Sequence, residues 1–330
     1  MAKKLEVRLF SEQQHNAQIL TGFYLLGQGK DYDVRICDFI GRQDGNNSPK
    51  SSIVEVIADD GTKIAYDTLD GYQSPEAMEF FLKECDFYFK RSFSSEKNGQ
   101  MFPQYADKIY PLGFNYLVTY RGCPIKQSFS RRIAKTLCGR KTFEYFTPDK
   151  FECEPEFTAE PKIIFCTRLW KSMEINSMRI ELIKTLKSRY GDRFFGGLSD
   201  GEHERRLAPE LILPQKYTVR ENYLRKMQQS DICIASTGLH GSIGWKTGEY
   251  VAAAKGIVSE KLIYEVTGGF EEGKNYLSFD SVENCLRAVD ELVQNPDRLY
   301  EMKKANAAYY AGYLQPEQMI KNTLKVVYGE

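Results

Sequence analysis

Residues 231–256 read DICIASTGLHGSIGWKTGEYVAAAKG, and this stretch is the most informative in the chain. Its apolar start, 232–235, predicts a buried strand, and its alanine-rich end predicts a helix over 249–255. Glycines stand between them at positions 238, 241, 244 and 248. A strand that leads through a glycine-rich loop into a helix start is typical of an anion site, because glycine lets the backbone approach a ligand closely. A loop that simply needs several tight turns is the alternative interpretation.

The loop differs from the phosphate-binding loop of nucleoside triphosphatases. That motif, G-x-x-x-x-G-K-S/T, places lysine directly after its second glycine. Here Trp245 stands between Gly244 and Lys246. The sequence therefore does not predict a nucleoside triphosphatase.

Composition excludes several other classes. The chain has 330 residues, enough for two domains, and equal numbers of basic and acidic residues, 45 each. No overall charge favours nucleic acid as a partner. The eight cysteines show no C-x-x-C spacing and only three histidines are present, so we expect no metal site. Without a secretory signal or a long apolar run, we expect a soluble, cytoplasmic protein.

The first half alternates between strand and helix patterns. Asp60-Gly61 lies between two of the strands and predicts a hairpin turn. The predicted strands are 5–10, 34–39, 53–57, 63–66, 86–89 and 109–111, and the predicted helices are 15–26 and 75–83.

Residues 151–162 are acidic and contain two prolines, which predicts a linker. The alternation then restarts. Strands are predicted at 162–166, 193–195, 231–235 and 257–258, and helices at 177–190, 221–229, 249–255, 282–294, 296–310 and 316–327. Two such halves predict an α/β fold of two doubly wound, Rossmann-like domains that face a cleft.

The segment 249–260, EYVAAAKGIVSE, resembles the E-Y/A-L/M-A-x-G-K-P-I/V-I/V segment of GT-B glycosyltransferases of the group 1 type. Segments 269–283 and 295–302 resemble the parts of that family that follow, so the resemblance covers roughly 160–325. In the first half it rests on the strand–helix alternation and on residues 85–91, CDFYFKR.

The chain departs from the family pattern at three positions. Ala254 stands where the family usually has glycine, and Gly256 stands where it has proline. Retaining members often carry two glutamates eight positions apart, and Gly241 occupies the first of these positions before Glu249. The resemblance therefore leaves the choice between retention and inversion open.

The resemblance implies transfer of a sugar from a nucleotide sugar to a glycan or lipid-linked acceptor, as in polysaccharide biosynthesis, without metal or cofactor. It implies an acceptor domain over 1–150, the linker 151–162, and a nucleotide-sugar domain over 163–315. Residues 316–330 would form a helix that crosses back to the first domain. The alternatives are a sugar-nucleotide epimerase or hydrolase, and a catalytically degenerate GT-B protein with a binding or assembly role.

Cleavage of the anomeric bond needs a stabilised diphosphate, which a helix N-terminus and basic side chains can supply. Arg168 follows a predicted strand, and by resemblance Glu249 would accept hydrogen bonds from the ribose. A domain-interface cation and a first-turn carboxylate are the alternative interpretations. The predicted donor-binding residues are Arg168, Lys171, Gly238, His240, Gly241, Ser242, Lys246, Thr247 and Glu249.

Three residues are candidates for the base that deprotonates an acceptor hydroxyl. His15 follows the first predicted strand, and a histidine with a pKa of ~6.5 suits this step. Asp67 and Asp70 follow the strand 63–66 and are the rival candidates. Each also has a structural interpretation, as a helix-start histidine and as turn-forming aspartates.

Residues 121–141 contain seven basic residues, and Phe129, Ile133 and Leu137 lie on one helical stripe. Such a helix could contact an anionic leaflet, which predicts a peripheral position at the inner membrane face. A core-facing stripe with a solvated basic face is the alternative.

Overall fold

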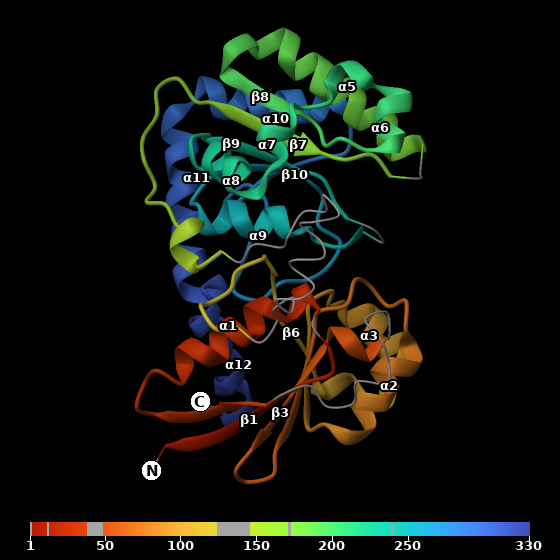
Figure 1. Ribbon diagram of the computed structural model, residues 1–330, viewed down its shortest axis with the longest axis vertical. Coiled ribbons are helices and arrows are strands. Elements are labelled where there is room, and N and C mark those ends of the chain that lie inside the picture. Colours follow the sequence, from red (N-terminus) through yellow and green to blue (C-terminus); the bar gives the residue numbers. More distant parts are fainter. Residues whose placement is uncertain (1, 12, 38–48, 124–145, 171–172, 239–240) are drawn as a thin grey trace, which may run out of the picture.

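The computed structural model describes residues 2–11, 13–37, 49–123, 146–170, 173–238 and 241–330. They form two α/β units, one above the other, with the chain crossing between them near residue 150 (Figure 1). The predicted fold class of two α/β domains is confirmed. No helix among these residues is long and apolar enough to cross a bilayer. Residues 124–141 of the predicted basic helix lie outside the described ranges.

The first unit is built on a six-stranded sheet in the order β2-β1-β3-β4-β5-β6. Strand β3 runs antiparallel to both of its neighbours, while the other pairs are parallel. The hairpin predicted at Asp60-Gly61 joins β3 to β4, and Gly61 adopts the positive φ (+88°) that glycine allows. The elements are β1 (Lys3–Leu9), α1 (Ala17–Leu26), β2 (Tyr32–Ile36), β3 (Ile53–Ala58), β4 (Lys63–Asp67), α2 (Pro75–Glu84), β5 (Phe87–Lys90), α3 (Ser95–Met101) and β6 (Ile109–Pro111).

The second unit has a fully parallel five-stranded sheet in the order β11-β10-β9-β7-β8. Its central strands are continuous apolar runs because helices cover both faces. The strands are β7 (Ile163–Thr167), β8 (Phe194–Leu198), β9 (Ile232–Ala235), β10 (Gly256–Glu260) and β11 (Leu277–Phe279). The helices are α5 (Met173–Tyr190), α6 (Glu202–Leu207), α7 (Gln215–Thr218), α8 (Arg220–Gln228), α9 (Trp245–Ala252), α10 (Val282–Gln294) and α11 (Pro296–Tyr309). The last helix of the chain, α12 (Pro316–Tyr328), packs elsewhere.

Helix α9 begins at Trp245, four residues before the predicted start at Glu249. The prediction followed the alanines and took the glycine at 248 as part of the loop. Gly248 is helical and touches the first unit, since a Cβ there would lie 3.1 Å from the Asn115 carbonyl oxygen. The early start corrects the predicted loop over 238–248, because it places Lys246 and Thr247 in the first helical turn.

The C-terminal helix α12 returns to the first unit and packs on α1 (Figure 1). A Cβ at Gly22 of α1 would lie 2.3 Å from the Pro316 carbonyl oxygen, so only glycine allows this approach. The amide of Gln18 donates to the Leu314 carbonyl at 3.1 Å, and the Tyr66 and Thr323 hydroxyls lie 2.8 Å apart. Residues at both ends of the chain therefore share one core.

We predict that Gly22→Ala destabilises the protein, because the added methyl must push α12 away from α1. Overpacking of this kind costs about 1 to 3 kcal/mol. Urea unfolding measures the change, and Gly99→Ala in α3 is the control because a Cβ there meets nothing within 4 Å. Equal stability of the two variants would contradict the close contact between α1 and α12.

Candidate functional site

A pocket of about 540 Å³ lies between the two units. Its wall on the first unit is formed by His15, which follows β1, and by Asp70 and Arg91, which follow β4 and β5. The opposite wall is formed by residues at the carboxyl ends of β7, β8 and β9 and by the start of α9. Open α/β sheets bind their ligands at this edge of the strands. Two sheets thus contribute their binding edges to one pocket.

The structure brings most of the predicted donor-binding residues to this pocket. Arg168 is exposed there, and its guanidinium lies 4.0 Å from the centre of a Trp170 ring. Gly241 and Thr247 do not line the pocket, and Lys171 and His240 lie outside the described residues. The residues that do line it are Arg168, Gly238, Ser242, Lys246 and Glu249.

The glycine loop offers fewer free backbone donors than predicted. The Gly238 N–H donates to the Ser242 carbonyl at 2.8 Å, which closes the loop on itself. Gly244 is instead the N-cap of α9, with no side-chain capping hydrogen bond, and it lines the pocket with Trp245 and Lys246. The Thr247 N–H already donates to the Gly244 carbonyl at 3.2 Å, so the N–H groups of Trp245 and Lys246 are the first-turn donors that this segment presents.

Lys246 is held at the end of β7. Its ammonium donates to the Cys166 carbonyl oxygen, and burial lowers the pKa of the side chain. No carboxylate in the described part of the chain forms an ion pair with it. Lys246 thus brings into the pocket a positive charge without an ion-pair partner among the described residues, although the nearby Glu249 carboxylate, itself paired with Arg220, also stabilises that charge.

Arg179 of α5 is a pocket residue that the sequence did not reveal. It is only 2% exposed, and burial lowers its pKa. Its guanidinium donates to the carbonyls of Arg168 at 2.8 Å and Thr237 at 3.2 Å, so it joins the loops that follow β7 and β9. Its Nε has no partner among the described residues. In the sequence Arg179 stands between Met178 and Ile180, and nothing local distinguishes it from an exposed arginine on a helix.

Glu249 lies at the base of the pocket and is paired with Arg220 of α8. Arg220 is a second pocket residue that the sequence did not reveal. Both carboxylate oxygens accept hydrogen bonds from the Arg220 guanidinium, and the Glu249 side chain is completely buried. The carboxylate that by resemblance would bind ribose hydroxyls is therefore already engaged by an arginine.

The pocket carries a surplus of positive charge. Five cations and two carboxylates line it, and each carboxylate is paired with one arginine, Asp70 with Arg91 and Glu249 with Arg220. Three cations, Arg168, Arg179 and Lys246, are left without a carboxylate partner in the described ranges. The buried Nε atoms of Arg91, Arg179 and Arg220 and the Trp245 Nε1 also have no acceptor there. These groups suit an anionic ligand that is rich in acceptor atoms.

His15 lies on the first wall, in a 3-10 turn over Gln14–Asn16. Its ring packs 4.7 Å from the Trp245 ring, so it joins the first unit to α9. Burial, together with the Arg91 charge, lowers the His15 pKa to about 4. The ring is neutral near pH 7, and its Nδ1 faces an Arg91 nitrogen at 3.5 Å. Nε2 therefore carries the proton and presents a donor.

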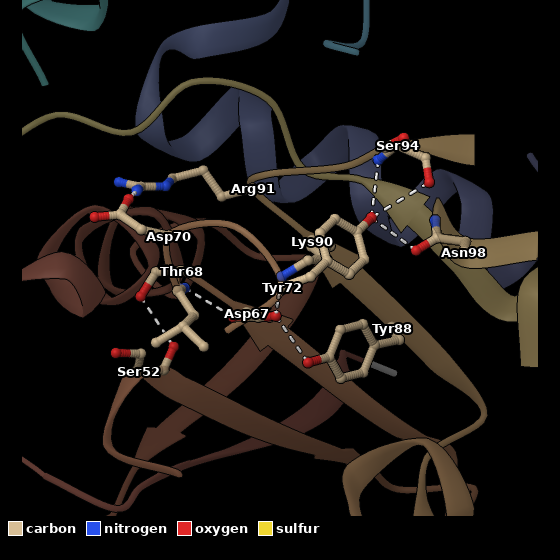
Figure 2. A network of polar contacts seen from close by, with 11 residues as sticks. Ser52, Asp67, Thr68, Asp70, Tyr72, Tyr88, Lys90, Arg91, Ser94 and Asn98 are labelled. Atoms are coloured by element: carbon tan, nitrogen blue, oxygen red, sulfur yellow. Dashed lines mark hydrogen bonds and ion pairs between the residues drawn. The ribbon is translucent and has the colours of Figure 1, made fainter. Parts of the chain in front are cut away.

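Asp67, predicted as a catalytic base, does not reach the pocket, and this corrects the prediction. Its carboxylate is fully buried and accepts hydrogen bonds from Lys90 at 2.7 Å and from the Tyr88 hydroxyl at 2.8 Å. Figure 2 shows this network beside the Asp70–Arg91 pair. The Asp67 carbonyl also accepts from the Arg91 N–H at 2.9 Å, so Asp67 fixes the position of Arg91.

No family model matches the chain, and no curated protein does. Solved structures with a similar fold include MnaA of S. aureus with UDP, at 13% identity and a TM-score of 0.45, covering 100% of this chain and 97% of that one. Anabaena HepE with UDP has 14% identity, a TM-score of 0.44 and coverage of 99% and 100%. The C-terminal domain of a glycosyl transferase group 1 family protein from Francisella tularensis has 13% identity, a TM-score of 0.36 and coverage of 50% and 95%. All three similarities concern the fold.

We predict that Asp67→Asn destabilises the first unit by about 3 to 5 kcal/mol, because it leaves the Lys90 ammonium buried without its counter-ion. The double variant Asp67→Asn/Lys90→Met removes that charge and should recover most of the loss. Urea unfolding measures both. If the single variant is as stable as the wild type, the buried ion pair is not the support of this wall.

We predict that His15 makes stability fall as the pH drops from 6.5 toward 4. The folded pKa of about 4 lies below the ordinary value of 6.5, so the unfolded chain binds more protons in this interval. The contribution is on the order of 1 to 3 kcal/mol. Urea unfolding at pH 7.5 and pH 4.5 should show a smaller pH effect in His15→Gln than in the wild type. The control His203→Gln, away from the pocket, should keep the full effect, and an unchanged effect in His15→Gln would refute a neutral, buried ring.

Proposed function

We propose that the chain is a GT-B type glycosyltransferase that moves a sugar from a nucleoside diphosphate sugar to a glycan or lipid-linked acceptor. The observation that carries this proposal is the surplus of three cations in a pocket lined by the carboxyl ends of strands from two sheets. The resemblance of residues 249–260 to the group 1 type adds to it.

The donor diphosphate would lie against Arg168, Arg179 and the first turn of α9. The free Nε of Arg179 and the exposed guanidinium of Arg168 can each donate to phosphate oxygens, and Lys246 adds a point charge. As the anomeric bond breaks, negative charge grows on the leaving diphosphate, and preorganised cations and N–H groups stabilise it. In this mechanism no metal ion is needed for that step.

The acceptor would bind at the first wall. The Asp70 side chain is 38% exposed and is the only carboxylate that the described part of the first unit brings to the pocket. Paired with Arg91, it would accept the hydroxyl proton of the acceptor. Because the Nε2 of His15 is a donor, His15 would orient an acceptor or sugar oxygen. We therefore place the base at Asp70 and give His15 a binding role.

Thermal unfolding with nucleotides tests the donor site. We predict that UDP or GDP, or one of their sugars, stabilises the wild type by about 2.7 kcal/mol at 100 times its Kd, and that CMP, which has a single phosphate, does not. Arg168→Gln should lose most of this effect, and Arg179→Lys should weaken it. The matched control is Arg225→Gln, because Arg225 is exposed on α8 and paired with Glu221. No stabilisation by any nucleotide would refute the proposal and favour a degenerate GT-B protein.

Turnover separates transfer from the other reactions of a sugar nucleotide. A transferase releases nucleoside diphosphate only when a glycan or lipid-linked acceptor is present, whereas an epimerase or hydrolase consumes the donor alone. Asp70→Asn should abolish turnover while nucleotide binding persists. Turnover that needs added divalent metal would contradict the role given to the arginines and Lys246.

A further inference from the structure

A second groove lies at the opposite edge of the second sheet. Its volume is also about 540 Å³, and it is formed where β7 and β8 begin. Four cations line it, Lys162, Lys187, Arg193 and Lys226, with one carboxylate, Asp192. We call it the amino-edge groove. Because the strands are parallel, it is separated from the pocket described above by the length of the sheet.

The cations of the amino-edge groove have no ion-pair partners in the described ranges, in contrast to their neighbours on the same helices. On α5, Lys184 pairs with Glu210 at 2.8 Å and Arg189 pairs with Asp290, while Lys187 has no carboxylate within ion-pair distance. On α8, Arg225 pairs with Glu221 at 3.2 Å, while Lys226 has none. The chain as a whole has a formal net charge of zero, so the groove differs from the rest of the protein in its local excess of positive charge.

The groove is concave, and aromatic residues support its cations. The Lys226 ammonium lies 5.4 Å from the centre of the Phe195 ring, and the Arg193 guanidinium lies 5.9 Å from that of Tyr190. Cation–π contacts keep these side chains near the groove without neutralising them. Gln229 and Ser230 line the groove as well and add polar groups. A ligand in it would meet positive charge from both α5 and α8.

We propose that the amino-edge groove is a second oxyanion site, which takes two or more phosphate groups together, either linked in one molecule or carried by neighbouring lipid headgroups. Four cations against one carboxylate leave a surplus that a single monoanion would not balance, whereas a diphosphate or triphosphate would. Lysine binds phosphate as a point charge, and arginine binds it with paired N–H donors. The site does not depend on the proposed donor site, since the two share no lining residue.

Calorimetric titration with inorganic tripolyphosphate tests the proposal. We expect Lys187→Gln/Arg193→Gln to lose a tripolyphosphate site of the wild type, with at least a tenfold weaker affinity. The control Lys184→Gln/Arg189→Gln, which removes ion-paired cations from the same helix α5, should bind as the wild type does. Both double variants change exposed side chains, so neither is expected to disturb folding. Nucleotide-induced stabilisation should be the same in all three proteins, which separates this site from the donor pocket.

Two sources could supply such a ligand, a soluble polyphosphate compound or phosphate headgroups on a membrane. Sedimentation with vesicles of phosphatidylglycerol and phosphatidylcholine distinguishes them. Vesicle binding that Lys187→Gln/Arg193→Gln abolishes would assign the site to headgroups, and loss of tripolyphosphate binding alone would assign it to a soluble ligand. If the groove variant matches the wild type in both assays, or the control loses as much, the proposal is overturned.

Discussion

The structure depends on how positive charge is held at the carboxyl ends of β7 and β9. Arg179 donates to the carbonyls of Arg168 and Thr237, and Lys246 donates to that of Cys166. Backbone carbonyls satisfy hydrogen bonds, but as neutral dipoles they leave the net charge in place. Burial then makes that charge costly, as the lowered pKa values of Arg179 and Lys246 indicate. An anionic ligand would relieve this cost, so the contacts that order the loops also suit the diphosphate that we propose as ligand.

In the first unit, by contrast, the charged side chains at and behind the pocket wall are paired with each other. Asp67 pairs with Lys90, and Asp70 pairs with Arg91. The neutral His15 ring then adds a hydrogen-bond donor without adding charge. One wall of the pocket is thus strongly positive and the other nearly balanced, which fits a charged donor facing an acceptor that presents a hydroxyl group. The contact of His15 with Trp245 holds the two walls together at one point.

The strands of both sheets except β11 could be predicted because their apolar runs and the Asp60-Gly61 turn are local signals. Strand β11 was missed because its three residues, LSF, are too few to form an apolar run. The start of α9 could not be predicted, because Gly248 lies inside the helix at a position where the Asn115 backbone approaches it closely, and a sequence does not show that contact. Arg179, Arg220 and Arg91 were missed for a related reason. Arginines are common on surfaces, and the partners that bury them lie on other elements.

For Asp67 the sequence suggested a function that the structure does not support. Its position at a strand end suggested a catalytic base, but its buried contacts with Lys90 and Tyr88 make it a structural residue. At Ala254 the structure gives a physical reason for the glycine that the resembling family usually has at this position. The family usually has glycine at this position, and Ala254 has a φ of +50°, in the left-handed region that favours glycine. The fold therefore keeps the turn that follows α9 and accepts the strain of a Cβ there.

We propose that the cations at the carboxyl ends of β7 and β9 hold a diphosphate. A crystal structure with the nucleoside diphosphate that stabilises the protein most tests this directly. We predict that the phosphate oxygens lie within hydrogen-bond distance of Arg168, Arg179 and the first-turn N–H groups of α9. A diphosphate bound away from these groups, with the Nε of Arg179 still lacking an acceptor, would contradict the account.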